Sequence, residues 1–237
     1  MIKISDLQKT YNKKEVLNIP HLEINPGEVV GIVGNNGAGK STLFKLILDL
    51  IAADKGEILI QDINVKESEE WKEFTGTYLD NSFLLDFLNA EEYFQFIGSF
   101  TNLDEETIEE RIQEFKSFLG VENLDKKKYI RDFSSGNKQK AGIIGALLHH
   151  PNLLILDEPF NFLDPTSQER TNALLKAFNK KYNSTILISS HNLEHTLHIC
   201  TRVLLLENGY IIKDLSGDST LFYDKIANYF KNNSTYD

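Results

Sequence analysis

The stretch GNNGAGKST at residues 34–42 constrains the fold of this chain more than any other. It matches the pattern G-x-x-x-x-G-K-[ST], with Gly34, Gly39, Lys40 and Ser41 at the fixed positions. Glycines let the main chain wrap around an oxyanion, so that successive N–H groups point at phosphate. The lysine reaches the β- and γ-phosphates, and the serine hydroxyl completes the coordination of Mg²⁺. The residues predicted to bind nucleotide here are Gly34, Asn35, Asn36, Gly37, Ala38, Gly39, Lys40, Ser41 and Thr42.

The flanking sequence supports this Walker A loop. Residues 29–33, VVGIV, are short, apolar and β-branched, which is typical of a buried parallel strand. Residues 42–50 then have the pattern of a buried helix, whose positive dipole end favours phosphate. The competing interpretation is a glycine-rich turn before a core helix. We prefer a phosphate site because strand, loop and helix stand in the required order.

Composition excludes several classes of protein. The chain has 237 residues, 41% hydrophobic and 25% charged, which suits one large α/β domain with an insertion. A net charge of −10 argues against a broad nucleic-acid footprint, so no direct nucleic-acid partner is expected. The single cysteine, Cys200, indicates a reducing compartment and a core position. We expect neither a secretory signal nor a membrane span, because every apolar run is shorter than the roughly 20 residues a span needs.

The remaining patterns predict how the rest of the chain is organised. Residues 1–7 alternate as an edge strand would, and residues 16–24 predict a second strand. Residues 84–133 lack proline and carry apolar residues at helical spacing, which predicts an inserted all-helical subdomain. Asn208-Gly209 predicts a hairpin turn. Residues 216–237 are expected to form a C-terminal helical tail.

An acidic pair follows the apolar run Leu153–Leu156. The carboxyl end of a buried strand is where an α/β sheet places ligand groups. Asp157 is expected to hold Mg²⁺, and Glu158 to polarise an attacking water as general base. Such a pattern is common by itself, but it is informative downstream of a phosphate loop.

Two further positions have both a functional and a structural interpretation. The turn at Ser134, Ser135 and Gly136 precedes a helix, so it is either a second anion site or an ordinary N-cap. His191 follows a predicted strand, residues 185–189, where it can contact a γ-phosphate. Residues 191–195 also match H-x-x-E-H, a zinc-protease pattern, with His198 as a third imidazole. Zinc is disfavoured because His191 belongs to a strand end rather than to one continuous helix.

Taken together, the order and spacing of these pieces resemble the nucleotide-binding subunit of an ATP-binding cassette (ABC) transporter, from about Ile2 to Leu215. The resemblance implies a P-loop NTPase core with a mainly parallel sheet, an antiparallel N-terminal β subdomain and an inserted helical subdomain. It divides the single domain into a core (1–83 and 134–215), a helical subdomain (84–133) and the tail (216–237).

Residue roles follow from the resemblance one by one. Tyr11 matches the adenine-stacking aromatic, and His191 matches the switch histidine. Asp157 matches the strand acid that holds Mg²⁺, and Glu158 the catalytic glutamate. Asp164 belongs to the loop that crosses the dimer interface. Residues 133–137, FSSGN, match the signature usually written LSGGQ, with Ser134 and Gly136 intact.

The resemblance also implies a mode of action. Family members form head-to-tail dimers around two ATP molecules, each lying between one subunit's phosphate loop and the other's signature. ATP and Mg²⁺ are then the cofactors, and a separate transmembrane permease docks on the helical subdomain. The chain would be cytoplasmic, held peripherally on the inner face of the membrane, with an identical or paired ATPase subunit. The short tail favours an export-type system.

Departures and alternatives remain at this stage. The family's usual Mg²⁺-linking glutamine is replaced by Asn81, with Asp80 as the other option, and the signature has Ser135 and Asn137 in place of Gly and Gln. A cytosolic ABC ATPase not coupled to transport, for example in Fe–S assembly, is a second hypothesis. A GTPase is a third, but the sequence lacks the N-K-x-D loop that would read the base.

Overall fold

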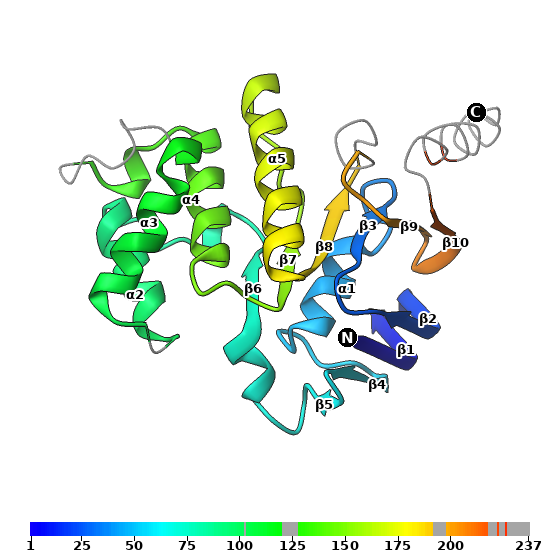
Figure 1. The fold of residues 1–237 in the computed structure, drawn as a ribbon. Helices are drawn as coiled ribbons and strands as arrows, with labels where there is room; N and C mark the ends of the chain where they lie inside the picture. Colours follow the sequence, from blue (N-terminus) through cyan, green and yellow to red (C-terminus); the bar gives the residue numbers. More distant parts are fainter. Residues whose placement is uncertain (102, 120–127, 192–197, 218–221, 223–225, 227–237) are drawn as a thin grey trace. The chain divides into compact units, whose positions relative to one another are not determined.

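The structure is a computed structural model that describes all residues except 102, 120–127, 192–197, 218–221, 223–225 and 227–237 (Figure 1). The chain divides into two compact units, each described by itself. The first comprises Met1–Trp71 and Thr185–Asp237, and the second comprises Lys72–Ser184. Within the described ranges, no helix has the length and apolarity to cross a membrane. Most of the predicted C-terminal tail lies outside the described residues, where only Phe222 and Ile226 are described beyond 217.

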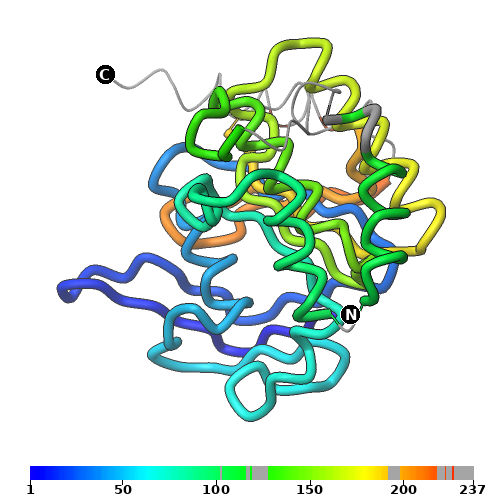
Figure 2. Tube along the Cα trace, turned by 90° about the vertical axis from the view of Figure 1, so that its left-hand side faces the viewer, coloured from blue at the N-terminus to red at the C-terminus, as the bar shows by residue number. Residues whose placement is uncertain are grey.

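The first unit contains an antiparallel sheet formed by β1 (Ile2–Tyr11), β2 (Lys14–Ile24), β4 (Lys55–Ile60) and β5 (Ile63–Asn64). Its order is β2-β1-β4-β5, and β1 and β2 run side by side as a long hairpin (Figure 2). The prediction that residues 1–7 form an edge strand is wrong. β1 pairs with β2 on one side and β4 on the other. Alternation of apolar and polar residues indicates that one face of a strand is buried, but it does not show how many strands pair with it.

The first unit also contains the parallel strands β3 (Val29–Val33), β8 (Thr185–Ser190) and β9 (Arg202–Glu207). β3 is fully buried and pairs in parallel with both of the others, as its apolar sequence predicted. β10 (Tyr210–Ser216) pairs antiparallel with β9. The hairpin turn is confirmed, since Asn208 and Gly209 have φ of 48° and 85°, the positive values that a type I′ turn requires.

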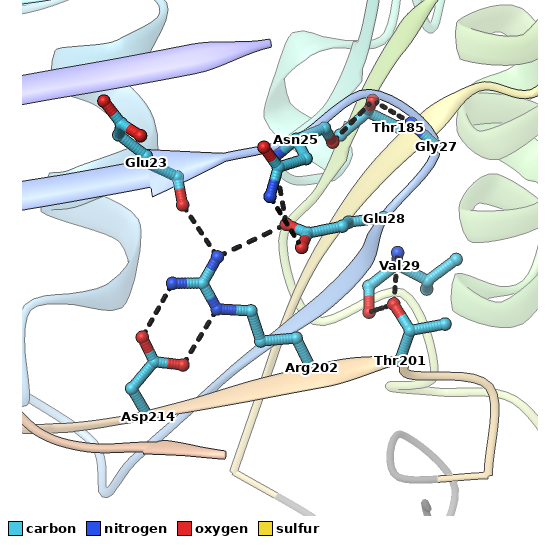
Figure 3. Close-up of polar contacts among 9 residues, drawn as sticks. All are labelled: Glu23, Asn25, Gly27, Glu28, Val29, Thr185, Thr201, Arg202 and Asp214. Atoms are coloured by element: carbon cyan, nitrogen blue, oxygen red, sulfur yellow. Dashed lines mark hydrogen bonds and ion pairs between the residues drawn. The ribbon is translucent and has the colours of Figure 1, made fainter. Parts of the chain in front are cut away.

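Arg202, at the start of β9, organises one end of these strands (Figure 3). Its guanidinium donates to both carboxylate oxygens of Asp214 at 2.8 and 2.6 Å, and to the main-chain oxygen of Glu23 at 2.7 Å. Glu28 accepts a further bond at 3.3 Å. Thr201 and Thr185 bind the main chain on either side of Glu28, at Val29 and Gly27. These bonds hold the start of β3 in place.

The second unit places two parallel strands beside a group of helices. β6 (Thr75–Tyr78) pairs with β7 (Leu153–Leu156), so that Tyr78 lies opposite Leu156. The α-helices are α2 (Ala90–Ser99), α3 (Glu105–Leu119), α4 (Ser135–Leu147) and α5 (Pro165–Tyr182). Short 3₁₀ helices are η1 (Glu70–Phe74, at the boundary of the units), η2 (Asn81–Phe83) and η4 (Ile130–Asp132).

The helical character predicted for residues 84–133 is confirmed where this stretch is described. α2, α3 and α4 pack against one another (Figure 1). α2 begins with a capping box, in which Asn89 and Glu92 each accept from the other's main-chain N–H. Buried apolar side chains hold the group together: Tyr93, Phe94, Ile108, Ile112, Phe115 and Phe118. The predicted boundaries of the helical subdomain, residues 84 and 133, remain a prediction. The compact unit that contains these helices is larger and also includes residues 72–83 and 134–184.

Candidate active site

Backbone shape in the phosphate loop depends on glycine at two kinds of position. A Cβ on Gly34 would lie 2.2 Å from the main-chain oxygen of Leu206, so the loop can leave β3 only without a side chain there. Gly37 and Gly39 have φ of +82° and +110°, which L-residues rarely adopt. α1 (Lys40–Ile47) begins directly after Gly39, two residues earlier than the helix that the sequence predicted over residues 42–50.

Lys40 lies inside the loop that it serves. Its Nζ donates to the main-chain oxygens of Gly34 at 2.7 Å and Asn35 at 3.3 Å, and the residue is only 6% exposed. Asn35, Asn36 and Ser41 are exposed beside it. A buried ammonium held by loop carbonyls, next to N–H groups at a helix start, suits a polyphosphate.

The loop is also braced by the turn between β9 and β10 and, through that turn, by β2 of its own unit. The Gly209 N–H donates to the Ala38 oxygen at 2.9 Å, and the Asn18 N–H donates to the Gly209 oxygen at 2.9 Å. Tyr11 ends β1 of the same hairpin as Asn18 and is 45% exposed, with the Lys9 ammonium 5.2 Å from its ring centroid. An exposed ring suits base stacking, but its role with adenine remains a prediction.

His191 leaves the sheet at the same edge as the phosphate loop. Val33 and Ser190 are register partners in the parallel pair β3–β8, so Gly34 and His191 are the next residues along both strands. The structure therefore brings these two predicted site residues to one sheet edge. The rival zinc interpretation needs His195, which lies outside the described residues. Among those that are described, no group of three or more His, Cys, Asp and Glu could hold a metal ion.

The second unit gathers the acidic pair into a pocket of about 340 Å³. Because β6 and β7 are parallel and in register, the segments after Tyr78 and Leu156 emerge at one edge. Asp157 is 8% exposed, and its N–H donates to the Tyr78 oxygen at 2.9 Å. The lining residues are Tyr78, Leu79, Asp80, Asn81, Gln139, Asp157, Glu158, Asn161 and Phe162.

The two candidates for the Mg²⁺-linking position have different contacts. Asp80 caps η2, and its carboxylate accepts from the Ser82 N–H at 2.6 Å. The amide of Asn81 instead lies 2.9 Å from the Tyr78 hydroxyl. Asn81 and Asp157 thus bring an amide oxygen and a carboxylate to one pocket. These are the hard oxygen donors that Mg²⁺ prefers, beside waters and substrate phosphates. The donor set fits Mg²⁺.

Ser134 has the structural role that the sequence left open. It is the N-cap of α4, and its hydroxyl accepts from the Asn137 N–H at 3.3 Å. Ser134 and Ser135 are exposed, so the turn is available to a ligand. Gly136 is needed for a different reason, because a Cβ there would lie 2.7 Å from the main-chain oxygen of Phe162. The signature turn and the loop after β7 therefore touch through the main chain.

The loop after β7 is strained. Glu158 and Phe162 have φ of 49° and 62°, and non-glycine residues in the left-handed region cost about 1–2 kcal/mol each. Phe162 is also 69% exposed. Asp164 ends the loop as the N-cap of α5, accepting from the N–H and hydroxyl of Ser167 at 3.0 and 2.6 Å. These bonds hold the pKa of Asp164 below its usual value.

Sequence reasoning did not single out five of the residues that line the pocket with Glu158. They are Tyr78, Leu79, Gln139, Asn161 and Phe162. A position directly after a signature turn, as for Gln139, is a usable signal. Phe162 stands within a loop already singled out. For Tyr78 no local signal exists, because its importance comes from residues distant in sequence.

Comparisons with known proteins place these features in a family. Residues 17–161 match the family model described as ABC transporter. The chain is 32% identical over 232 residues to the lantibiotic transport ATP-binding protein SrtF of Streptococcus pyogenes, covering 96% of each chain. It is 31% identical to the methionine import ATP-binding protein MetN of Clostridioides difficile (strain 630), covering 90% of this chain and 68% of that protein. A solved ATP-binding subunit of an ABC transporter is similar at a TM-score of 0.84 and 27% identity, covering 96% and 93%.

The fold, the phosphate loop and these relatives agree. The predicted α/β P-loop NTPase fold and ATP binding are confirmed, and the hypothesis of a cytosolic ATPase unrelated to transport is not favoured. The chain belongs to the ABC transporter family, as an ATP-binding, ATP-hydrolysing subunit of a transport system.

Proposed function

We propose that this chain hydrolyses ATP in a head-to-tail dimer and thereby drives a separate membrane permease. The observation that carries the proposal is the pocket of the second unit. Asn81, Asp157 and Glu158 line this pocket together with Gln139 of α4, the helix that follows the signature turn. Carboxylate and amide groups gathered beside a signature helix suit the hydrolysis of a metal-bound polyphosphate.

The residues divide the chemistry as follows. Lys40 and the N–H groups of the phosphate loop bind the β- and γ-phosphates and stabilise the charge that develops during transfer. Asp157, Asn81 and Ser41 would hold Mg²⁺, which neutralises phosphate charge when bound. Glu158 accepts a proton from water as its oxygen attacks the γ-phosphorus, while the bond to the ADP oxygen breaks. His191 contacts the γ-phosphate from the end of β8.

The signature turn supplies the dimeric part of the proposal. Ser134 and Ser135 are exposed at the start of α4, where main-chain N–H groups and a hydroxyl can meet a phosphate oxygen. We assign this turn to the ATP of a second copy, with Asp164 and its loop at the interface. The close approach of Gly136 to Phe162 would then couple the signature turn, which binds the ATP of the second copy, to the catalytic loop after β7.

Complementation between two inactive variants tests this arrangement. Lys40→Ala removes the phosphate-loop cation, and Ser134→Arg blocks the signature turn. Each variant alone should lose ATP turnover and ATP-dependent dimerisation. Mixed together they form some dimers in which one intact phosphate loop faces one intact signature, so turnover should return. Wild-type chain serves as the positive control. No recovery in the mixture, with each variant folded, contradicts a site shared between two copies.

The permease is expected to contact the helices that follow β6. Phe87, Phe96 and Phe100 are 58%, 42% and 71% exposed. Phe96 and Phe100 lie edge to face at 4.8 Å between ring centroids. Exposed aromatic side chains of this size are typical of contact sites with other proteins. They support peripheral attachment to the cytoplasmic face of the membrane through a partner.

Membrane fractionation tests the attachment. The triple variant Phe87→Ser, Phe96→Ser and Phe100→Ser should move from the membrane fraction to the supernatant of its native cells. The matched control is Leu50→Ser, which removes a 51% exposed apolar side chain from the other unit. Equal membrane recovery of wild type and triple variant would contradict this docking surface.

Export is the direction that we propose, on the sequence expectation alone. The relatives do not favour either direction, since they include a lantibiotic transport protein and a methionine import protein. ATP-driven uptake of cargo into inside-out vesicles carrying the permease would support export. Uptake only into right-side-out vesicles would contradict it.

A further inference from the structure

Tyr78 has more contacts in the pocket than any role assigned so far explains. Its main-chain oxygen accepts from the Asp157 N–H at 2.9 Å. Its hydroxyl lies 2.9 Å from Asn81 Oδ1 and 2.9 Å from Gln139 Oε1. Gln139 continues the chain, because its Nε2 donates to the main-chain oxygen of Glu158 at 2.9 Å. One phenol therefore joins the metal-side amide, the signature helix and the catalytic loop.

The number of hydrogens decides the direction of these bonds. A phenol has a single hydrogen, so it can donate to one amide and must accept from the other. The Gln139 nitrogen already donates to Glu158, so its oxygen faces Tyr78 and takes the phenol hydrogen. The phenol oxygen must then accept from the nitrogen of Asn81, which requires the amide to be turned by 180° so that its nitrogen takes the place of Oδ1. The turned amide fits the same space, because amide oxygen and nitrogen occupy nearly the same volume.

We propose that Tyr78 is a positioning residue that turns the Asn81 amide so that its oxygen faces the metal and phosphate side of the pocket. The proposal rests on the proposed ATP site. It explains how asparagine can serve in a position where a longer glutamine is usual. The asparagine side chain is one methylene shorter than glutamine. The hydrogen bond from its nitrogen to Tyr78 fixes the orientation of its amide.

Both Tyr78 and its partner Gln139 are buried. Tyr78 is 4% exposed, and removal from water raises the pKa of its hydroxyl far above neutral pH. Gln139 is 3% exposed, so it too depends on these partners.

A glycine of α4 makes room for this ring. A Cβ on Gly142 would lie 2.2 Å from Tyr78 Cε2 and 2.3 Å from its Cδ2. Tyr93 is placed in a similar way three residues further along the helix, where a Cβ on Gly145 would lie 2.9 Å from its hydroxyl oxygen. Tyr93 does not line the pocket, so it offers a matched control.

The test measures how strongly Mg²⁺ tightens ATP binding, in full-length chain carrying Glu158→Gln to stop turnover. For each variant the Kd for ATP is measured by calorimetry in excess EDTA and in excess Mg²⁺. Tyr78→Phe keeps the ring over Gly142 and removes the hydroxyl. The ratio of the two Kd values should fall about fivefold, the change expected for the loss of one net hydrogen bond. The Kd in EDTA should not change, and Tyr93→Phe should alter neither value.

A double-mutant cycle separates positioning from general packing. Asn81→Ala should lower the ratio at least as much as Tyr78→Phe. Adding Tyr78→Phe to Asn81→Ala should have no further effect on the ratio, because the hydroxyl acts through the missing amide. Additive losses would overturn the proposal, as would an equal weakening of ATP binding in EDTA and in Mg²⁺.

The outcomes distinguish this inference from the function beneath it. If the parent chain binds ATP more tightly with Mg²⁺ and Tyr78→Phe behaves like the parent, the proposed function stands and the role of Tyr78 is wrong. If the parent chain fails to bind ATP in either condition, the ATP site itself is wrong and the inference falls with it.

Discussion

The phosphate loop and the loop after β7 both contain residues with positive φ, but glycines occupy these positions in the first loop and residues with side chains occupy them in the second. Where the phosphate loop turns left-handed it has Gly37 and Gly39, and where β9 passes closest it has Gly34. The loop after β7 turns left-handed at Glu158 and Phe162, which carry full side chains. Glycine relieves strain in the first loop. In the second, strain is retained where side chains are needed, as is common at functional sites.

The largest expected effect comes from adding a methyl group to the phosphate loop. Gly34→Ala forces a Cβ to within 2.2 Å of a main-chain oxygen that no side-chain rotation can move. We expect the free energy of unfolding to fall by about 3 kcal/mol, the upper end for overpacking. Urea denaturation measures the change, and calorimetry should show the loss of ATP binding.

Gly37→Ala is the matched control within the same loop. Its φ is also positive, at +82°, but no atom lies within 4 Å of the added Cβ. Only backbone strain remains, so we expect a loss of about 1 kcal/mol. Equal losses at the two positions would show that close approach is not what requires glycine at Gly34.

A smaller effect is expected where glycine makes room for a ring rather than for backbone. Gly142→Ala places a Cβ against the rigid Tyr78 ring, and the free energy of unfolding should fall by about 2 kcal/mol. Combining it with Tyr78→Val, which removes the ring, should recover part of that loss. If the losses in free energy of unfolding of the two single variants simply add in urea denaturation, the Tyr78 ring does not depend on the space that Gly142 leaves for it.

Phe162→Gly makes the second loop resemble the first. Relief of left-handed strain, about 1–2 kcal/mol, outweighs the entropy cost of glycine, about 0.5–1 kcal/mol. We therefore expect the unfolding midpoint to rise by about 2 °C. Phe162→Ala keeps the Cβ and the strain, so it should not rise. A midpoint lowered by the glycine would mean that the exposed ring contributes more than its strain costs.

Asp164 should give the smallest effect, and one that depends on pH. Its folded-state pKa is lowered by bonds from Ser167, so its contribution to stability is full above the usual value of 3.8. The contribution is lost as the pH falls through the lowered pKa. Asp164→Asn can still cap α5 but cannot titrate. The midpoint of wild type should therefore fall more between pH 5 and pH 2 than that of the variant, by about 1–2 °C.

Local sequence patterns predicted much of this architecture. The run VVGIV gave the buried strand β3 because a strand covered on both faces has no polar side. The positions of Lys40, Asp157 and His191 relative to their strands followed from strand ends and loop residues alone. These features are encoded over a few neighbouring residues, so they can be read without knowing the partners.

The remaining features depend on contacts between distant segments. The neighbours of β1 could not be predicted from its alternation, and its edge assignment was wrong. The link from Tyr78 to Gln139 and Gly142 exists because β6 packs on α4. Likewise, Gly136 depends on the path of Phe162. No short pattern contains both members of such a pair.

ATP turnover by the purified chain, beside Glu158→Gln, tests the central claim most directly. General-base catalysis contributes about 10²–10⁴-fold, so the variant should lose turnover by at least about a hundredfold while ATP binding is kept. Its mass should double when ATP and Mg²⁺ are added, because the nucleotide that joins the two copies is no longer consumed. Turnover close to wild type in Glu158→Gln, or no ATP-dependent dimer in either chain, would contradict the account.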